Sequence, residues 1–204
     1  MKISSLAAVA FMAVLASASV LSAGTLTLDI QVDKAEYGRD EPVAWEIHAT
    51  SDTPADAGDF GIATIGVDLT ESRPESIPPA DLIGPDFGFA NGYSFPALGT
   101  PVGNSLLAIG NTQFMNGGNA VGGGPMLLAS GTYVPTHLGE HMLEVTVDPG
   151  SATYWSEAAP GISQANYLVT PGSAGFTVVP EPGSLVLLLG AVVGGALLWW
   201  RRRK

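Results

Sequence analysis

The chain has 204 residues, a formal net charge of −11 and no cysteine. This length is enough for one domain with flanking segments, and the lack of cysteine excludes disulfide bonds as a source of stability. The acidic balance excludes nucleic acid as a partner, because binding a phosphate backbone requires a basic surface.

The first 23 residues have the pattern of an export signal. Lys2 is the only charged residue, an apolar run extends from Leu6 to Leu15, and small residues follow. A basic start, a short apolar core and a small-residue zone predict a secretory signal peptide over residues 1–23, with cleavage between Ser22 and Gly24. The alternative, a retained anchor helix, is disfavoured because the apolar run is too short to span a bilayer.

Alternating apolar and polar residues after the signal predict half-buried strands. The first covers residues 25–32, the second begins after Pro42, and the third covers residues 62–69. The side chains expected to point inward are Leu26, Leu28, Ile30, Val32, Val43, Trp45, Ile47, Ala49, Ile65, Val67 and Leu69. Further strands are predicted over residues 106–109, 126–134, 141–147, 167–170 and 175–179.

The body between residues 24 and 179 shows no sustained helical period. Its predicted strands are short and separated by turn-forming stretches, and the proline-rich segment 72–85 cannot be a central strand. This pattern predicts an all-β, antiparallel β-sandwich. Residues 32–45 and 138–145 are also similar to strands of immunoglobulin-like and cohesin-like sandwiches, which supports the fold class only.

The last 25 residues form a different kind of segment. Pro180, Glu181, Pro182 and Gly183 break regular structure, and an uncharged apolar run of 16 residues follows over 185–200. As a helix this run is about 24 Å long, slightly short of a hydrocarbon core of about 30 Å. We expect a single C-terminal transmembrane helix, ended by membrane-interface and basic residues on the cytoplasmic side: Trp199, Trp200, Arg201, Arg202, Arg203 and Lys204.

This order of a Val-Pro-Glu-Pro turn, an apolar run and a terminal basic cluster resembles the PEP-CTERM sorting tail. The resemblance covers residues 180–204 and implies a sorting motif at Pro180, Glu181 and Pro182, recognised by a membrane protease-transpeptidase called exosortase. It also implies export, anchoring in the inner membrane before processing, and then a cell-surface or extracellular location. Proteins with this tail occur in Gram-negative bacteria that make extracellular polysaccharide, and their body domains are diverse.

One motif in the body is shared with zinc proteases. His137, Glu140 and His141 spell H-x-x-E-H, in which both histidines would ligate one zinc ion from a single helical face. Here Pro135 precedes the motif and Gly139 lies within it, so we expect a hairpin turn. We therefore predict no catalytic residues, no cofactor and no enzymatic activity.

Acidic side chains in two loops are weak candidates for calcium, which takes six to eight oxygen ligands. Asp52, Asp56 and Asp59 form one cluster, and residues 33–41 hold a second. Between residues 24 and 180 the chain carries 18 acidic and 3 basic residues, a formal charge of −15. Because acidic clusters are usually solvated turns, solvation outside the cell is the favoured interpretation.

Two other functions stay open beside a structural or interaction role in the extracellular matrix. A carbohydrate-binding module would use aromatic side chains that stack on sugar rings, although large aromatic rings more often fill the core. The candidate rings are Phe87, Phe89, Tyr93, Phe95, Tyr154 and Trp155. A cryptic secreted hydrolase would use Ser163 or His137, but residues 161–165 lack the closing glycine of a nucleophile elbow.

Overall fold

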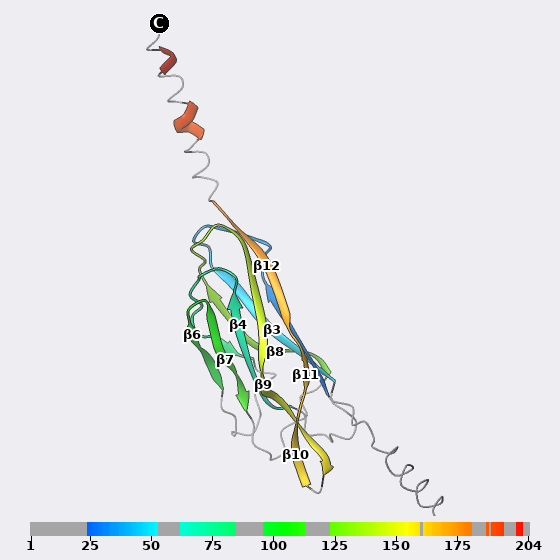
Figure 1. Cartoon of the computed structure of the whole chain (residues 1–204). Helices are drawn as coiled ribbons and strands as arrows, with labels where there is room; N and C mark the ends of the chain where they lie inside the picture. The colour runs from blue at the N-terminus through cyan, green and yellow to red at the C-terminus, as the bar shows by residue number, and fades with distance from the viewer. Residues whose placement is uncertain are drawn as a thin grey trace, which may run out of the picture.

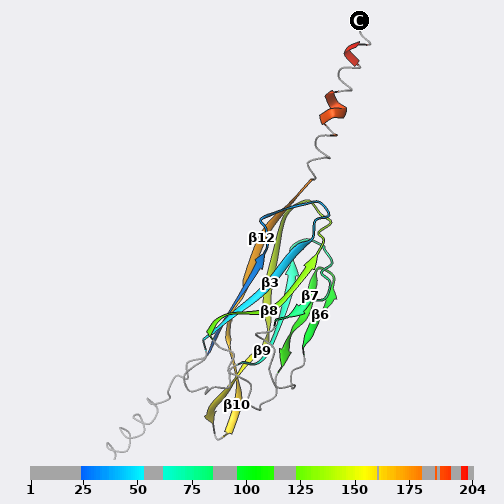
Figure 2. The same cartoon turned by 180° about the vertical axis from the view of Figure 1, so that it is seen from behind.

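The computed structural model describes residues 24–52, 62–84, 96–112, 123–159, 161–180, 187, 189–193 and 199–201. The strands form two sheets, which pack face to face as a β-sandwich (Figures 1 and 2). The predicted signal peptide lies outside the described residues, and so do Asp56, Asp59 and the aromatic residues Phe87, Phe89, Tyr93 and Phe95.

The first sheet has the strand order β11-β1-β3-β8-β5. Its strands are β1 (Thr25–Val32), β3 (Val43–Asp52), β5 (Leu82–Ile83), β8 (Gly123–Tyr133) and β11 (Leu168–Thr170). The predicted alternation is confirmed in β1 and β3, where Leu26, Leu28 and Ile30 and then Val43, Trp45, Ile47 and Ala49 are buried. The proline-rich segment contributes only the two-residue edge strand β5, as its composition requires.

The second sheet has the order β2-β12-β9-β4-β7-β6, and β10 pairs with β9 beyond this path. Its strands are β2 (Glu36–Gly38), β4 (Ile62–Glu71), β6 (Ala97–Val102), β7 (Ser105–Thr112), β9 (Gly139–Ala159), β10 (Gly161–Asn166) and β12 (Gly172–Val179). Ile65, Val67 and Leu69 face the core, as predicted. Strands β2, β6 and β10 were not expected from the sequence.

The sandwich is not purely antiparallel, in contrast to the prediction. Strand β11 pairs in parallel with β1, and β12 pairs in parallel with β2. The cause is the end of the chain, which lies in the first sheet as β11, crosses at Pro171 and continues in the second sheet as β12. The segment β11–β12 thereby connects the two sheets at the side where β11 is the edge of the first sheet and β2 the edge of the second.

Buried aliphatic and aromatic side chains from both sheets form one core. Trp45 is 1% exposed, and its ring lies against Gly131 of the neighbouring strand β8. Burial of one large aliphatic side chain contributes roughly 1.5–3 kcal/mol, and this core holds more than twenty buried hydrophobic residues. The core is therefore sufficient to stabilise the sandwich without disulfide bonds.

Strand β9 is much longer than its predicted core of residues 141–147. Residues 139–145 pair with β12, residues 143–154 pair with β4 across a bulge, and residues 153–159 pair with β10. The β4–β9 register jumps from Val67↔Val147 to Ile65↔Ala152, which marks a bulge in β9. The β9–β10 hairpin extends from the end of the sandwich opposite the C-terminus (Figure 1).

The other end of the sandwich is called the tail end here, because β12 leaves the body there. It consists of the loops 33–42, 72–80, 103–104 and 134–138 with the adjoining strand ends. The registers place these segments together: Val179 is opposite Gly38, Val178 opposite Gly139, Thr70 opposite Ser105, and Val43 opposite Tyr133.

Candidate functional site

The H-x-x-E-H residues lie where the turn 134–138 enters β9, at the tail end. Gly139 begins the strand with φ of 107°, a conformation that strains any side chain other than glycine. Glu140 and His141 are consecutive strand residues, so Glu140 is exposed while His141 is buried. The prediction of a hairpin turn is wrong, because residues 134–138 connect β8 to β9 in the other sheet and Gly139 to His141 belong to β9. The helical face that a zinc protease needs is replaced by a strand.

His137 belongs to a cluster around the buried carboxylate of Glu75. That carboxylate accepts hydrogen bonds from the backbone N–H groups of Thr136 (3.0 Å) and His137 (2.9 Å) and from the Thr136 hydroxyl (2.9 Å). His137 Nδ1 lies 2.8 Å from Glu75 Oε1, which makes a further hydrogen bond. Burial alone would raise the pKa of Glu75, but the hydrogen bonds from Thr136 and His137 outweigh it and lower the pKa to about 2.

His141 belongs to a second cluster, around the buried carboxylate of Glu71. The Tyr133 hydroxyl and the Ser72 hydroxyl both donate to Glu71, and His141 Nδ1 lies 3.4 Å from Glu71 Oε2. His141 Nδ1 and Glu71 Oε2 are not aligned as a hydrogen bond. Burial, followed by the hydrogen bond to Glu71, raises the pKa of Tyr133 far above its usual range.

The imidazole ring of His141 is also fixed by its other contacts. Its Nε2 lies 2.9 Å from the carbonyl oxygen of His137 and donates to it. The ring stacks on Phe176 of β12, with centroids 5.0 Å apart and an interplanar angle of 14°. Phe176 in turn meets Tyr37 edge-on at 5.3 Å, so the cluster joins β2, β9 and β12.

The two histidines therefore contact different carboxylates and do not converge on one point. His141 has a fully buried side chain, while that of His137 is 46% exposed. Within the part of the chain that the structure describes, no group of three or more histidine, aspartate or glutamate side chains could hold a metal ion. What the arrangement does is tie the loops 72–80 and 134–138 to each other and to the last strand.

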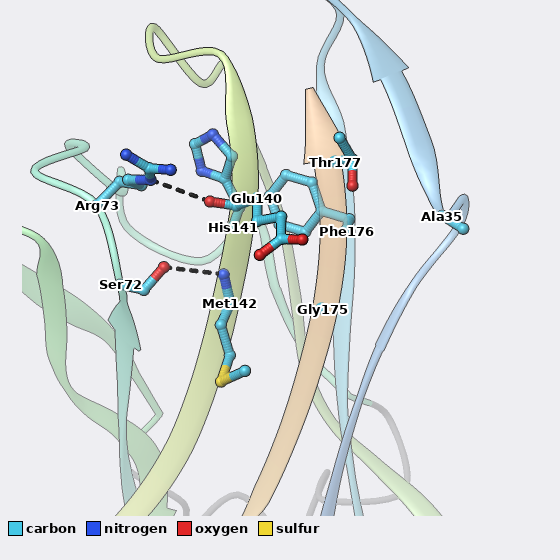
Figure 3. Close-up of a pocket in the computed structure, with 9 residues that line it drawn as sticks. All are labelled: Ala35, Ser72, Arg73, Glu140, His141, Met142, Gly175, Phe176 and Thr177. Atoms are coloured by element: carbon cyan, nitrogen blue, oxygen red, sulfur yellow. Dashed lines mark hydrogen bonds between the residues drawn. The ribbon is translucent and has the colours of Figure 1, made fainter. Parts of the chain in front are cut away.

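An open groove crosses the outer face of the second sheet beside these clusters (Figure 3). Gly175 of β12 leaves space opposite Met142 of β9, whose side chain is 52% exposed. Arg73 closes one side, where its Nε donates to the carbonyl oxygen of Glu140 at 3.0 Å. The groove has a volume of about 670 Å³ and is lined by Ala35, Ser72, Arg73, Glu140, His141, Met142, Gly175, Phe176 and Thr177. Its lining includes the exposed side chain of Met142, the cation of Arg73 and the carboxylate of Glu140.

The acidic loop 33–41 uses much of its charge internally. The hydroxyl of Tyr37 donates to Asp33 at 2.5 Å, and this bond lowers the pKa of Asp33. Lys34 forms an ion pair with Glu41 that lowers the pKa of Glu41 and raises that of Lys34. Burial, followed by the hydrogen bond to Asp33, raises the pKa of Tyr37 to about 12. These contacts hold the loop in place.

The first predicted calcium cluster is only partly described. Asp52 is exposed at the end of β3, and Asp56 and Asp59 lie outside the described residues. Calcium binding by this loop stays a prediction.

The remaining candidate residues lie toward the β9–β10 hairpin. Tyr154 is 4% exposed and packs against Tyr167, with ring centroids 4.8 Å apart, so it fills the core instead of presenting a sugar-stacking surface. The backbone of Trp155 is paired with Gln164, and its side chain lies outside the described part. Ser163 lies in β10, where its backbone pairs with Ser156 of β9. It is therefore part of a strand and not of the strand-to-helix turn that a nucleophile elbow requires.

The tail begins at Pro180, directly after Val179, the last residue of β12. Pro180 is exposed, and Glu181, Pro182 and residues 202–204 lie outside the described part. The apolar tail residues that are described are more than half exposed: Leu187, Leu189, Val192, Val193, Trp199 and Trp200. Among the described residues, no helix is both long and apolar enough to cross a membrane. Arg201 is helical and exposed.

Comparison with known proteins gives only distant likenesses. No family profile matches the chain, and no curated protein matches its sequence. The third cohesin ScaC of Acetivibrio cellulolyticus, solved with the ScaB dockerin, is similar with a TM-score of 0.46 and 14% identity over 76% of this chain and 99% of the cohesin.

Two further solved structures are similar at the same level. CaCohA2 from Clostridium acetobutylicum has a TM-score of 0.44 and 12% identity, covering 77% of this chain and 92% of its own. A CARDB domain from Pyrococcus furiosus, solved with di-metal ions, has a TM-score of 0.36 and 14% identity, covering 80% of this chain and 100% of its own. At these levels of similarity no residue role carries over to this chain.

Proposed function

We propose that the chain is an exported structural or interaction protein of the cell surface or extracellular matrix, sorted by its C-terminal tail. The observation that carries this proposal is the order of the last 25 residues. The Pro-Glu-Pro turn, the uncharged run over 185–200 and the four basic residues follow the last strand directly. In this proposal exosortase is the sorting partner, and the inner membrane holds the tail before processing.

The exposure of the tail supports this assignment. Large apolar surfaces are seldom left in water, and Leu187, Leu189 and Val192 are 77%, 63% and 62% exposed. The sandwich already has a complete core of its own, to which these side chains do not belong. A lipid environment would cover them, with Trp199 and Trp200 at headgroup level and Arg201 beyond them.

A role in binding, and not in catalysis, is proposed for the body. The best-defined polar clusters, around Glu71 and Glu75, are occupied by internal hydrogen bonds and hold loops together. A surface rich in carboxylates keeps an exported domain soluble and apart from anionic polymers unless cations bridge them. The body is thus suited to display on the surface, with its interaction partner still to be found by binding assays.

Intact mass and fractionation of the protein from its native host test the proposal. We expect a mature form that begins near Gly24, lacks the segment after Pro182 and is found outside the inner membrane. Glu181→Gln should block processing and leave the protein in the inner membrane, whereas the matched surface variant Glu140→Gln should be processed normally. A wild-type form that retains Trp199–Lys204 in the inner membrane would refute sorting and leave a plain anchor.

A further inference from the structure

The basic residues of the body are concentrated at the tail end. Between residues 24 and 180 the chain has only Lys34, Arg39 and Arg73, which all lie in tail-end loops. The twelve strands contain no lysine or arginine, although acidic residues face solvent along them, including Asp29, Glu46 and Glu144. Positive charge is thus available at one end of the sandwich alone.

The acidic residues at the tail end are partly neutralised or hidden. Glu71 and Glu75 are buried, Asp33 accepts from Tyr37, and Glu41 pairs with Lys34. Glu36, Asp40 and Glu140 remain exposed there. The tail end thus has three basic and five solvent-accessible acidic side chains, so it is less acidic than the sides of the sandwich, where the described strands carry acidic residues and no lysine or arginine.

Exposed apolar side chains occur in the same place. Val134 and Leu138, in the turn before β9, are 47% and 42% exposed. Val102, at the end of β6, is 54% exposed. Aliphatic side chains next to basic ones are the combination that partitions to a lipid headgroup layer, because the first group leaves water and the second is attracted to phosphate.

The length of the connection brings this end close to the membrane that we assign to the tail. Five residues, 180–184, separate Val179 from the apolar run that begins at Leu185. Fully extended, they reach about 17 Å, and the headgroup region on one side of a bilayer is about 5–8 Å thick. The tail-end loops are therefore held within reach of the headgroups for as long as the tail is inserted.

We propose that the tail end is a lipid-contacting surface, which rests on the phospholipid headgroups of the membrane that holds the tail. Val134 and Leu138 lie at headgroup level and Arg39 and Arg73 face lipid phosphates. The acidic sides are repelled by the same phosphates, so the sandwich stands upright and the β9–β10 hairpin points away from the membrane. This inference depends on the proposed membrane insertion of the tail.

Two exposed leucines at opposite ends provide a matched test. Leu138 lies at the tail end, and Leu168, 67% exposed, pairs with Thr25 at the other end of β1. The chain has no native cysteine, so Leu138→Cys and Leu168→Cys can each be labelled with one fluorophore. The labelled chains begin at Gly24, as the predicted mature form does, and keep the tail to Lys204. They are reconstituted into phosphatidylcholine–phosphatidylglycerol vesicles that contain a lipid with a nitroxide on its headgroup. We expect at least threefold stronger quenching at position 138 than at position 168.

A second variant tests the charge argument in the same vesicles. Arg39→Glu, added to Leu138→Cys, should reduce the difference in quenching between the two positions by at least half. Equal quenching at positions 138 and 168 in vesicles that carry the protein would overturn this inference and leave tail insertion standing. Failure of the unlabelled protein to float with the vesicles would overturn tail insertion, and the lipid-contacting surface with it.

Discussion

The carboxylate of Glu75 joins the tail-end loops 72–80 and 134–138, and replacing it with the isosteric amide in Glu75→Gln should weaken the fold. In the native structure this side chain is 2% exposed and accepts from two backbone N–H groups, a hydroxyl and an imidazole nitrogen. In glutamine an NH₂ group replaces one of the two carboxylate oxygens. This NH₂ group cannot accept hydrogen bonds and would face the donors that now bind Glu75. The loops 72–80 and 134–138 would lose their connection.

The size of the effect follows from the pKa of Glu75. A decrease from 4.5 to about 2 corresponds to about 3 kcal/mol of stabilisation, at 1.36 kcal/mol for each pH unit. The folded-state pKa is lower than the unfolded value, so this stabilisation is fully present above pH 5. It is lost as the pH falls from about 5 to about 2, because the unfolded state takes up the proton first.

Urea unfolding of the full-length chain in detergent, followed by tryptophan fluorescence at several pH values, measures both effects. We expect Glu75→Gln to lower the free energy of unfolding by about 2–3 kcal/mol at pH 7, and the difference from wild type to shrink toward pH 2. Glu140→Gln, an exposed glutamate on β9, is the control and should change stability by less than about 0.5 kcal/mol. A loss below about 0.5 kcal/mol in Glu75→Gln, or a loss that does not vary with pH, would refute the reasoning.

Two further predictions concern backbone space and strain. Ala108 in β7 has φ of 58°, so Ala108→Gly should raise stability by about 0.5–1 kcal/mol in thermal unfolding, and a fall in melting temperature would contradict this. A Cβ at position 131 would lie 2.4 Å from the Trp45 ring, so Gly131→Ala should cost about 2–3 kcal/mol. A Cβ at position 175 would lie 3.7 Å from its nearest neighbouring atom, so the control Gly175→Ala should cost less than about 1 kcal/mol. Equal losses of stability in Gly131→Ala and Gly175→Ala would contradict the prediction and show that a backbone shift relieves the close approach to Trp45.

The strands that the sequence predicted are those in which one face is buried and the other is solvated. In β1, β3 and β4 apolar and polar residues alternate because successive side chains point to the core and then to the outer face of the sheet. Strands β2, β6 and β10 were missed because they are short or contain glycine and proline, and they gain their pairing from neighbouring strands. Local pattern carries no information about such pairing.

The polar clusters show a signal in the sequence that was not used. Glu71 continues the inward positions of Ile65, Val67 and Leu69, and His141 precedes Leu143 and Val145 at the same spacing of two. A charged or titratable residue at an inward position of a strand predicts a buried partner. The identity of the partner was beyond prediction, because Glu71 and Tyr133 are 62 residues apart in the chain and meet only when the two sheets pack.

The distribution of charge on the surface also depends on how the sheets and loops pack, and the sequence alone does not show it. This distribution connects the proposed sorting by the tail with the proposed lipid-contacting surface. The count of 18 acids against 3 bases indicates a body that any phosphate surface repels. The fold places all three bases at the tail end and buries Glu71 and Glu75 there, where both carboxylates accept internal hydrogen bonds. Repulsion is therefore weakest at the one end that the short connection to the tail holds beside the membrane, and it is strongest on the sides. This distribution of charge keeps the repulsion between the acidic domain and lipid phosphates lowest at the end that the tail holds beside the membrane.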